Sequence, residues 1–134
     1  MASSNAIAQP EIIQVTVGVK FFKDGDSIAI TEVKATSPNL KTGDKVIVKG
    51  NYALSSKPKA SLFLLETANK GSGKSNIRPE QKMEIMAGKG EFELSETLES
   101  NGYLHVSFYP VPAGEPFGGV YFGTAKQMEK ITLK

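Results

Sequence analysis

The side chains able to carry out acid–base, nucleophilic or metal chemistry are few in this chain of 134 residues. His105 is the only histidine and cysteine is absent. This excludes thiol catalysis and the metal sites that proteins build from several histidines or cysteines. A single histidine supplies neither a nucleophile nor a partner that orients it. We therefore assign no catalytic residue, expect no cofactor, and predict that the protein is not an enzyme.

Acidic residues recur in pairs that invite a search for glycosidase or calcium chemistry. The pairs are Glu91 with Glu93, Glu96 with Glu99, and Asp24 with Asp26. A glycosidase needs two carboxyl groups about 5 to 10 Å apart in a cleft, whereas acids of like phase on one strand usually form a solvent face. Asp24 and Asp26 lack the further ligands and the bidentate glutamate of a calcium loop. We expect no metal site, and a turn around these two aspartates.

One segment, 68–75 (ANKGSGKS), fits a permissive form of the phosphate-binding loop, in which backbone amides and a lysine hold phosphate groups. That mechanism needs a helix directly after the loop, with its positive end facing the phosphates. Pro79 follows four residues after Ser75, and no apolar helical face lies between them. We expect a flexible crossover loop that binds no nucleotide.

Aromatic side chains late in the chain form the one set that points to binding. The candidate site residues are Tyr103, His105 and Tyr109, which share one face of a predicted strand, with Phe117 and Tyr121 following in sequence. Flat rings on a rigid strand stack on sugar rings or anchor a partner protein. In the alternative interpretation, one tyrosine lies in the core and the others stabilise cross-strand pairs.

The elements that must position these side chains are strands, because apolar residues alternate with period two along most of the chain. The expected strands cover 13–21, 28–35, 46–54, 60–66, 103–109, 120–124 and 130–133, and 83–94 is expected to form a hairpin around 88–90. Turn signals such as 23–26 and 55–58 separate them. The alternation changes phase near Thr31, which predicts a bulge there. Gly50 lies in phase with its apolar neighbours and indicates close packing.

About eight short strands with turn signals every ten or so residues predict an all-β fold, an antiparallel two-sheet sandwich of immunoglobulin-like topology. Helix formers in 78–86 compete with this, but their alternation favours a strand, and no helix longer than two turns is expected. The predicted core residues are Val46, Val48, Leu62, Leu64, Leu104, Val106 and Phe108. The length suits one domain, which we place at 11–134 after a disordered segment at 1–10.

Charge and hydropathy exclude two classes of partner. The net charge is +2 and Arg78 is the only arginine, so few groups are present for phosphate forks or guanine edges. Lysines are interspersed with acids rather than gathered in a stripe along a nucleic-acid backbone. No run approaches the roughly 20 apolar residues of a membrane helix. We expect neither nucleic-acid binding nor membrane insertion, and a protein or a polysaccharide as partner.

Several ordered blocks of aromatic and glycine residues carry a family resemblance. They are 25–33 (GDSIAITEV), 50–56 (GNYALSS), 105–110 (HVSFYP) and 117–124 (FGGVYFGT). Together they resemble short immunoglobulin-like β-sandwich modules of planctomycete bacteria. The resemblance implies the fold but no activity and no catalytic residues. Tyr103 stands where related modules have tryptophan, so the resemblance does not carry a binding role to that position.

The sequence thus leads to a non-enzymatic interaction or structural module, with carbohydrate binding through the aromatic face as the alternative. Ala6, Ile7 and Ala8 have the small-x-small form of a signal-peptidase site, although no charged region and apolar region precede them. We expect an exported protein, periplasmic or secreted, that acts at the cell envelope.

Overall fold

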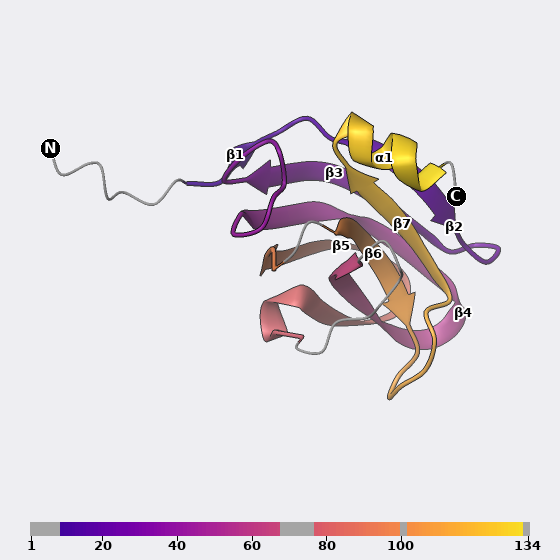
Figure 1. Cartoon of the computed structure of the whole chain (residues 1–134). Coiled ribbons are helices and arrows are strands. Elements are labelled where there is room, and N and C mark those ends of the chain that lie inside the picture. The colour runs from indigo at the N-terminus through magenta and orange to yellow at the C-terminus, as the bar shows by residue number, and fades with distance from the viewer. Residues whose placement is uncertain (1–8, 68–76, 100–101, 133–134) are drawn as a thin grey trace, which may run out of the picture.

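The computed structural model describes residues 9–67, 77–99 and 102–132, and these fold into an antiparallel sheet with one short α-helix (Figure 1). The strands are β1 (Glu11–Ile12), β2 (Thr16–Phe21), β3 (Ser27–Ala35), β4 (Lys45–Thr67), β5 (Lys82–Thr97), β6 (Tyr103–Tyr109) and β7 (Gly118–Gly123), and the helix is α1 (Ala125–Thr132). A single 3-10 turn, Pro79–Gln81, precedes β5. The all-β prediction is confirmed. Residues 1–8 of the predicted disordered segment 1–10, and the segment 68–75 for which a crossover loop is predicted, lie outside the described residues.

The sheet curls into a half-barrel because its two longest strands belong to both of its halves (Figure 1). Residues 46–53 of β4 pair with β3, whereas residues 61–67 of the same strand pair with β6. β5 pairs with β4 on both sides of the bend. The strand order is β1-β3-β4-β6-β7-β2, with β5 attached to β4.

Two predicted chain reversals are wrong, because β4 and β5 bend at these positions instead of ending. Residues 55–58 were expected to end a strand and residues 88–90 to form a hairpin, but both strands continue through these positions. The register shifts between Leu54 and Lys59, and Leu54 pairs with Gly88. Gly88 has a φ of 122°, a conformation that glycine adopts without steric cost. The turn-forming residues of the two strands therefore meet as a corner.

The finer prediction of a two-sheet immunoglobulin-like sandwich of about eight strands is not confirmed. The described residues form one hydrogen-bonded sheet of seven strands. The N-terminal part of the chain contributes to both edges of the sheet. β1 pairs with β3 at one edge, and β2 pairs with β7 at the other. The chain therefore crosses from one half of the curled sheet to the other between Ile12 and Thr16.

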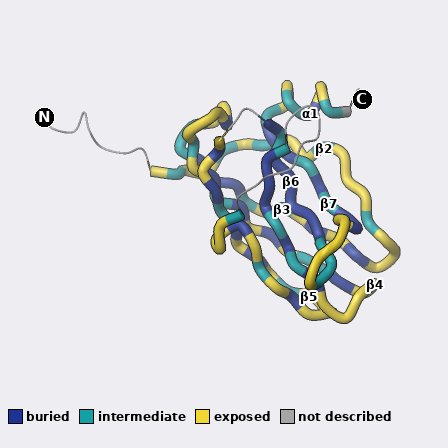
Figure 2. The backbone as a smooth tube through the Cα atoms, turned by 60° about the horizontal axis from the view of Figure 1, so that its bottom comes forward, coloured by how far each residue is buried: buried dark blue, intermediate teal, exposed yellow. Residues whose placement is uncertain are grey.

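The core lies on the concave side of the curled sheet, where every predicted core residue is buried. Figure 2 shows buried backbone along the middle strands and exposed backbone at the connections. Phe108 is fully buried, with Phe22 edge-on at 6.3 Å between ring centroids and Phe117 stacked at 5.5 Å. The alternation in β6 has thus been assigned the correct phase.

Two local predictions within β3 and β4 are confirmed. The register between these strands shifts between Ile30 and Glu32, which places the bulge at Thr31. The Thr31 hydroxyl donates to the Lys49 carbonyl at 3.2 Å. Gly50 is a site of close packing, since a Cβ there would overlap with the Ala29 carbonyl and the Phe92 ring.

The helix α1 corrects the strand predicted at 130–133. Its first turn is closed reciprocally, because the Gln127 backbone donates to Thr124 Oγ1 at 3.1 Å and the Thr124 backbone donates to Gln127 Oε1 at 3.0 Å. Met128 packs where a Cβ on Gly18 of β2 would lie. Within the described ranges, no helix has the length and apolar character that crossing a membrane requires.

Asp26 fastens the start of β3 to the corner of β4. Its Oδ1 accepts hydrogen bonds from the backbone amides of Ser55 at 2.7 Å and Ser56 at 3.0 Å, and its Oδ2 accepts one from the Ser56 hydroxyl. Burial acts to raise the pKa of Asp26, but the hydrogen bonds from Ser56 and Ser55 outweigh it and hold the pKa below its usual value. The buried carboxylate is a structural clamp, in agreement with the turn predicted there.

Candidate functional site

The outer face of β6 carries the residues predicted to form a binding site. With Leu104, Val106 and Phe108 in the core, the pleat directs alternate residues of the strand to the opposite side. His105 lies there, paired with Leu65 of β4 and Tyr121 of β7. The sheet therefore brings His105 and Tyr121 together, as neighbours across two strands.

His105 is buried and both of its ring nitrogens lie at hydrogen-bonding distance from hydroxyl groups. Nδ1 is 2.7 Å from Ser107 Oγ, and Nε2 is 2.7 Å from Thr67 Oγ1. The Tyr121 ring lies against the imidazole, with centroids 4.8 Å apart and planes tilted by 38°. Burial lowers the pKa of His105 to about 4, so the ring is neutral at pH 7.

The Ser107–His105–Thr67 contact is the one arrangement in this region with the residue types of nucleophilic catalysis. In a hydrolase triad a carboxylate orients the histidine and stabilises the imidazolium that forms. Here a neutral hydroxyl occupies that position, and burial disfavours the charged ring. The contact fixes the imidazole and satisfies its polar atoms. Sequence spacing places Ser107 on the same face as His105, whereas nothing in the sequence indicated Thr67.

A small hollow of about 180 Å³ opens beside this pair. Its lining is mostly apolar and includes Val19, Phe21, His105, Ser107, Gly119 and Tyr121. A Cβ on Gly119 would overlap with Ser107 Oγ, so glycine is required for the close approach of β6 and β7 there. Ligand pockets for drug-sized molecules occupy roughly 300 to 1,000 Å³. The hollow therefore suits a single side chain better than a whole small molecule.

The rim of the hollow is formed by β2, which is an edge strand. β2 pairs only with β7 among the described strands. Its apolar side chains are exposed rather than buried, with Phe21 63% accessible. The alternation predicts one strand over 13–21, but its apolar side chains in β2 do not form a buried face. The shift in register between Val17 and Lys20 and the crossing before Thr16 disrupt that face.

The other predicted site residues do not line this hollow. The Tyr109 ring packs against Phe63 of β4 at 4.9 Å between centroids. Phe117 is buried in the core against Phe108, and Lys57 Nζ lies 5.4 Å from the centroid of its ring. Tyr103 lines a separate hollow near α1. A continuous strip of exposed, coplanar rings is therefore not formed by the described aromatic residues.

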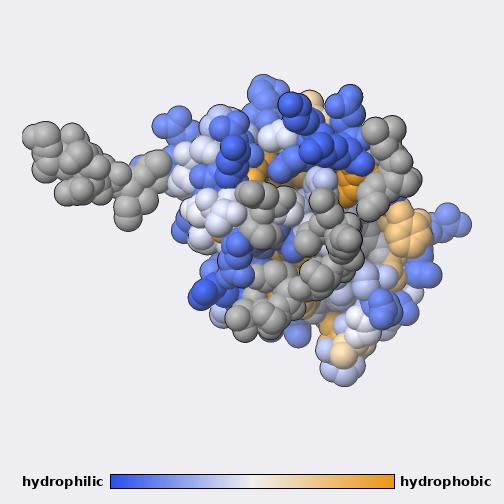
Figure 3. All heavy atoms as spheres, viewed as in Figure 1, coloured by the Kyte–Doolittle hydropathy of each residue, from blue (hydrophilic) through white to orange (hydrophobic). Residues whose placement is uncertain are grey.

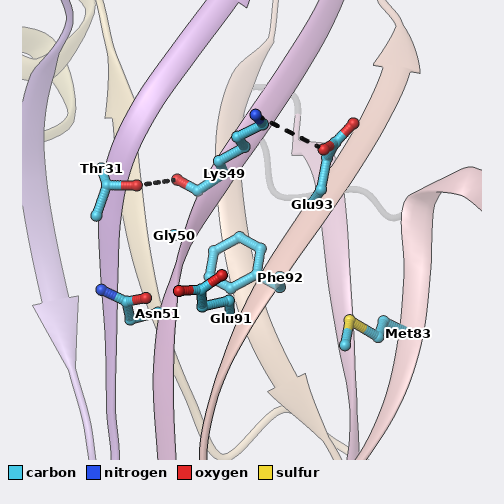
Figure 4. Close-up of a pocket in the computed structure, with 8 residues that line it drawn as sticks. All are labelled: Thr31, Lys49, Gly50, Asn51, Met83, Glu91, Phe92 and Glu93. Atoms are coloured by element: carbon cyan, nitrogen blue, oxygen red, sulfur yellow. Dashed lines mark hydrogen bonds and ion pairs between the residues drawn. The ribbon is translucent and has the colours of Figure 1, made fainter.

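The opposite half of the sheet offers a larger but polar hollow over β3, β4 and β5 (Figure 4). Lys49 Nζ and Glu93 Oε1 lie 4.0 Å apart across two strands. Glu91 and Glu93 are exposed, as expected for a solvent face. Glu96 is instead buried and accepts a hydrogen bond from Gln81 Nε2 at 2.7 Å, since it continues the inward phase of Phe92 and Leu94.

No group of three or more metal-ligating side chains occurs among the residues that the structure describes. The site is therefore characterised by its geometry alone: a neutral histidine, a tyrosine ring tilted against it and an apolar rim. Comparison of the chain with family models, with curated proteins and with solved structures found no match.

Proposed function

We propose that this protein is a non-enzymatic interaction module, and that it binds an extended apolar segment of a partner protein at the hollow beside β2. The observation that carries the proposal is the exposed edge of β2, with Val19 and Phe21 projecting next to the hollow that His105 and Tyr121 line. Exposed apolar patches of this kind mark interaction sites in otherwise polar protein surfaces.

The geometry of the edge supports a polypeptide as the ligand. A strand at a sheet edge presents backbone groups without partners, and a second chain can add to it. The hollow of about 180 Å³ then accepts one apolar side chain of the added segment. Figure 3 shows a small hydrophobic patch at the side of the molecule where β2 ends.

The chemistry of the hollow supports binding rather than turnover. The imidazole of His105 is held neutral by burial, and its partners are hydroxyl groups rather than a carboxylate. A neutral, fixed ring with an aromatic neighbour is a suitable wall for an apolar side chain. We place this module at the cell envelope, the compartment expected from the sequence.

Carbohydrate binding through the aromatic face receives less support. Stacking on successive sugar rings requires exposed rings with similar orientations, whereas His105 is 7% accessible and Tyr109 packs on Phe63. The planes of His105 and Tyr121 also differ by 38°. We also propose, from the sequence resemblance, that the protein is related to the immunoglobulin-like modules of planctomycete bacteria. This relationship does not change the proposed ligand.

Peptide selection with matched surface variants tests the proposed function. A phage-displayed library of random linear peptides is selected against the native protein, Phe21→Lys and Met86→Lys. Met86 is a matched control because it is 67% accessible, close to the 63% of Phe21, and lies on β5. We expect native protein and Met86→Lys to enrich peptides with an aromatic or aliphatic anchor, and Phe21→Lys to lose them.

Affinities of the selected peptides complete the test. An interface anchor commonly contributes about 2 kcal/mol or more, so Phe21→Lys should weaken binding roughly thirtyfold. Both variants should retain the thermal midpoint of the native protein, because the two side chains are exposed. Equal peptide enrichment by Phe21→Lys, or no enrichment by the native protein, would refute the proposal.

A further inference from the structure

A second hollow, of about 610 Å³, lies at the end of the sheet where β6 begins, α1 packs and the β3–β4 connection passes. The side chains that define it are Asn39, Lys41, Tyr103, Lys126, Gln127 and Lys130. We call it the lysine hollow. It is separate from the hollow beside β2 and shares no lining residue with it.

The charge of the lysine hollow is of one sign. Lys41, Lys126 and Lys130 line it, and none of its described lining residues is acidic. The ion pairs of the described residues join Lys34 to Glu32 and Lys49 to Glu93, so these three lysines take part in none of them. Lys126 and Lys130 are four residues apart on α1, a spacing at which like charges repel. A bound anion would relieve that repulsion.

The β3–β4 connection, which carries Asn39 and Lys41, is held in place by a buried side chain and by hydrogen bonds within the connection. Leu40 between them is buried at 2% accessibility and has a φ of 54°, in the left-handed region. The carboxylate of Asp44 accepts hydrogen bonds from the Lys41 backbone at 2.8 Å and the Ser37 hydroxyl at 2.6 Å. The Asp44 carboxylate is thereby engaged in hydrogen bonds within the connection. Asn39 and Lys41, on either side of Leu40, line the hollow.

The uncharged groups of the lysine hollow suit hydroxyl-rich rings. Tyr103 is half-buried and provides an aromatic ring at the base of β6. Gln127 uses Oε1 to close the first turn of α1, which leaves its amide nitrogen to donate to a ligand. Asn39 adds a second amide. Aromatic rings beside amides are a combination that holds sugars, by stacking and by hydrogen bonds to hydroxyls.

We propose that the lysine hollow binds an acidic polysaccharide, with uronate carboxylates against Lys126, Lys130 and Lys41 and one sugar ring on Tyr103. Lysine supplies point charges, which suit single carboxylates on successive sugars. The site contains no arginine, the residue that recognises phosphate in bidentate fashion. This binding is independent of the peptide binding proposed for the β2 edge.

Calorimetric titration with trigalacturonate at low ionic strength tests the proposal. The test variant is Lys126→Gln with Lys130→Gln, and the matched control is Lys82→Gln with Lys89→Gln, which removes the same charge from exposed positions on β5. We expect the test variant to lose about tenfold or more in affinity and the control to bind like the native protein. Binding should also weaken as salt is raised.

Further probes separate the proposal from its competitors. Neutral maltotriose should not bind, and Tyr103→Leu, which keeps apolar bulk but loses the ring face, should weaken trigalacturonate binding severalfold. Inorganic phosphate that competes as well as the saccharide would reveal a simple anion site, and polyglutamate binding unaffected by Tyr103→Leu would reveal an acidic-peptide site. Either result overturns the proposal, as does equal loss in the control pair or no binding of trigalacturonate by the native protein.

Discussion

The two halves of the curled sheet share one core but differ in their outer faces. Over β3 and the neighbouring parts of β4 and β5, charged side chains such as Lys49 and Glu93 point outward and pair with each other. Over β6, β7 and β2 the outer side chains are His105, Tyr121 and the exposed Phe21. The first face is charged and is stable in contact with water. The second leaves apolar surface accessible, and this is the surface proposed above to bind a partner.

The difference also separates two uses of alternation. In the half formed by β3 and the neighbouring parts of β4 and β5, the alternation places apolar side chains in the core and polar side chains in solvent. In the half formed by β6, β7 and β2, the outward residues form a second set of specific contacts. The Tyr121 ring lies tilted against His105, and the hydroxyl groups of Thr67 and Ser107 lie at its ring nitrogens. Contiguous exposed apolar surface of this kind marks interaction sites in proteins.

The largest expected effect concerns the core that the two halves share. Phe108→Ala should destabilise the protein by about 3 to 5 kcal/mol, the range for truncating a buried phenylalanine. Phe108 is fully buried between Phe22 and Phe117. The matched control, Phe21→Ala on the outer edge, should cost about 0.5 kcal/mol or less. Urea denaturation measures both, and similar midpoints for the two variants would contradict the assignment of inner and outer faces.

The next effect is a pH dependence that distinguishes the half formed by β6, β7 and β2. The pKa of His105 falls from 6.5 to about 4 through burial. An unfolded chain therefore takes up a proton below pH 6.5 that the folded chain refuses, and stability falls as the pH drops from 6.5 towards 4. The total loss is about 3 kcal/mol, at about 1.4 kcal/mol per pKa unit. No such loss is expected above pH 6.5, where the ring is neutral in both states.

His105→Gln isolates this contribution. The free energy of unfolding is measured by urea denaturation at pH 7 and pH 4.5 for the native protein and the variant. The native protein should lose more stability between the two values, since glutamine does not titrate. Parallel pH profiles for the two proteins would show that the histidine is not held neutral by burial.

The smallest of the expected effects lies at the corner between the halves. Asp26→Asn weakens the hydrogen bonds to Ser55 and Ser56 and should cost about 1 to 3 kcal/mol. The control is Asp24→Asn, an exposed neighbour expected to be nearly neutral. The pKa of Asp26 is lowered from 3.8, so its carboxylate stabilises the fold fully above about pH 4. That contribution is lost as the pH falls through the lower folded-state pKa.

Thermal unfolding at pH 7 and pH 3 tests this sign. The stability gap between native protein and Asp26→Asn should be largest at pH 7 and narrower at pH 3. A gap that widens on acidification would show that the Asp26 carboxylate does not clamp β3 to the corner of β4.

Much of the fold was predictable because alternation is a local property. The inward phase of Val46, Leu62 and Val106 follows from each strand by itself, and all three are fully buried. The bulge at Thr31 and the close packing at Gly50 also left direct marks in the sequence, as a change of phase and as a glycine among apolar residues.

The errors arose where a local signal has two tertiary outcomes. The segments 55–58 and 88–90 contain turn formers, and such residues end a strand or bend one equally well. Residues 88–90 pair with 52–54, and the register of the two strands shifts directly after that, within 55–58. This pairing between distant segments is not a local property of the sequence. In the same way, Lys130 was assigned to a strand, but the closed first turn at Thr124 and the packing of Met128 on Gly18 support a helix.

The candidate site was likewise predictable only where local alternation decides the direction of a side chain. The sequence by itself determined that His105 and Tyr103 face away from the core, since the side-chain direction in a strand alternates with residue number. Only the tertiary structure decided which residues come together: Thr67 meets His105, and Tyr103 lines one hollow with Lys41 and the lysines of α1. These neighbours come from strands, a loop and a helix distant in sequence, and their proximity depends on sheet order, register and the bend of β4. Local periodicity specifies none of those three quantities.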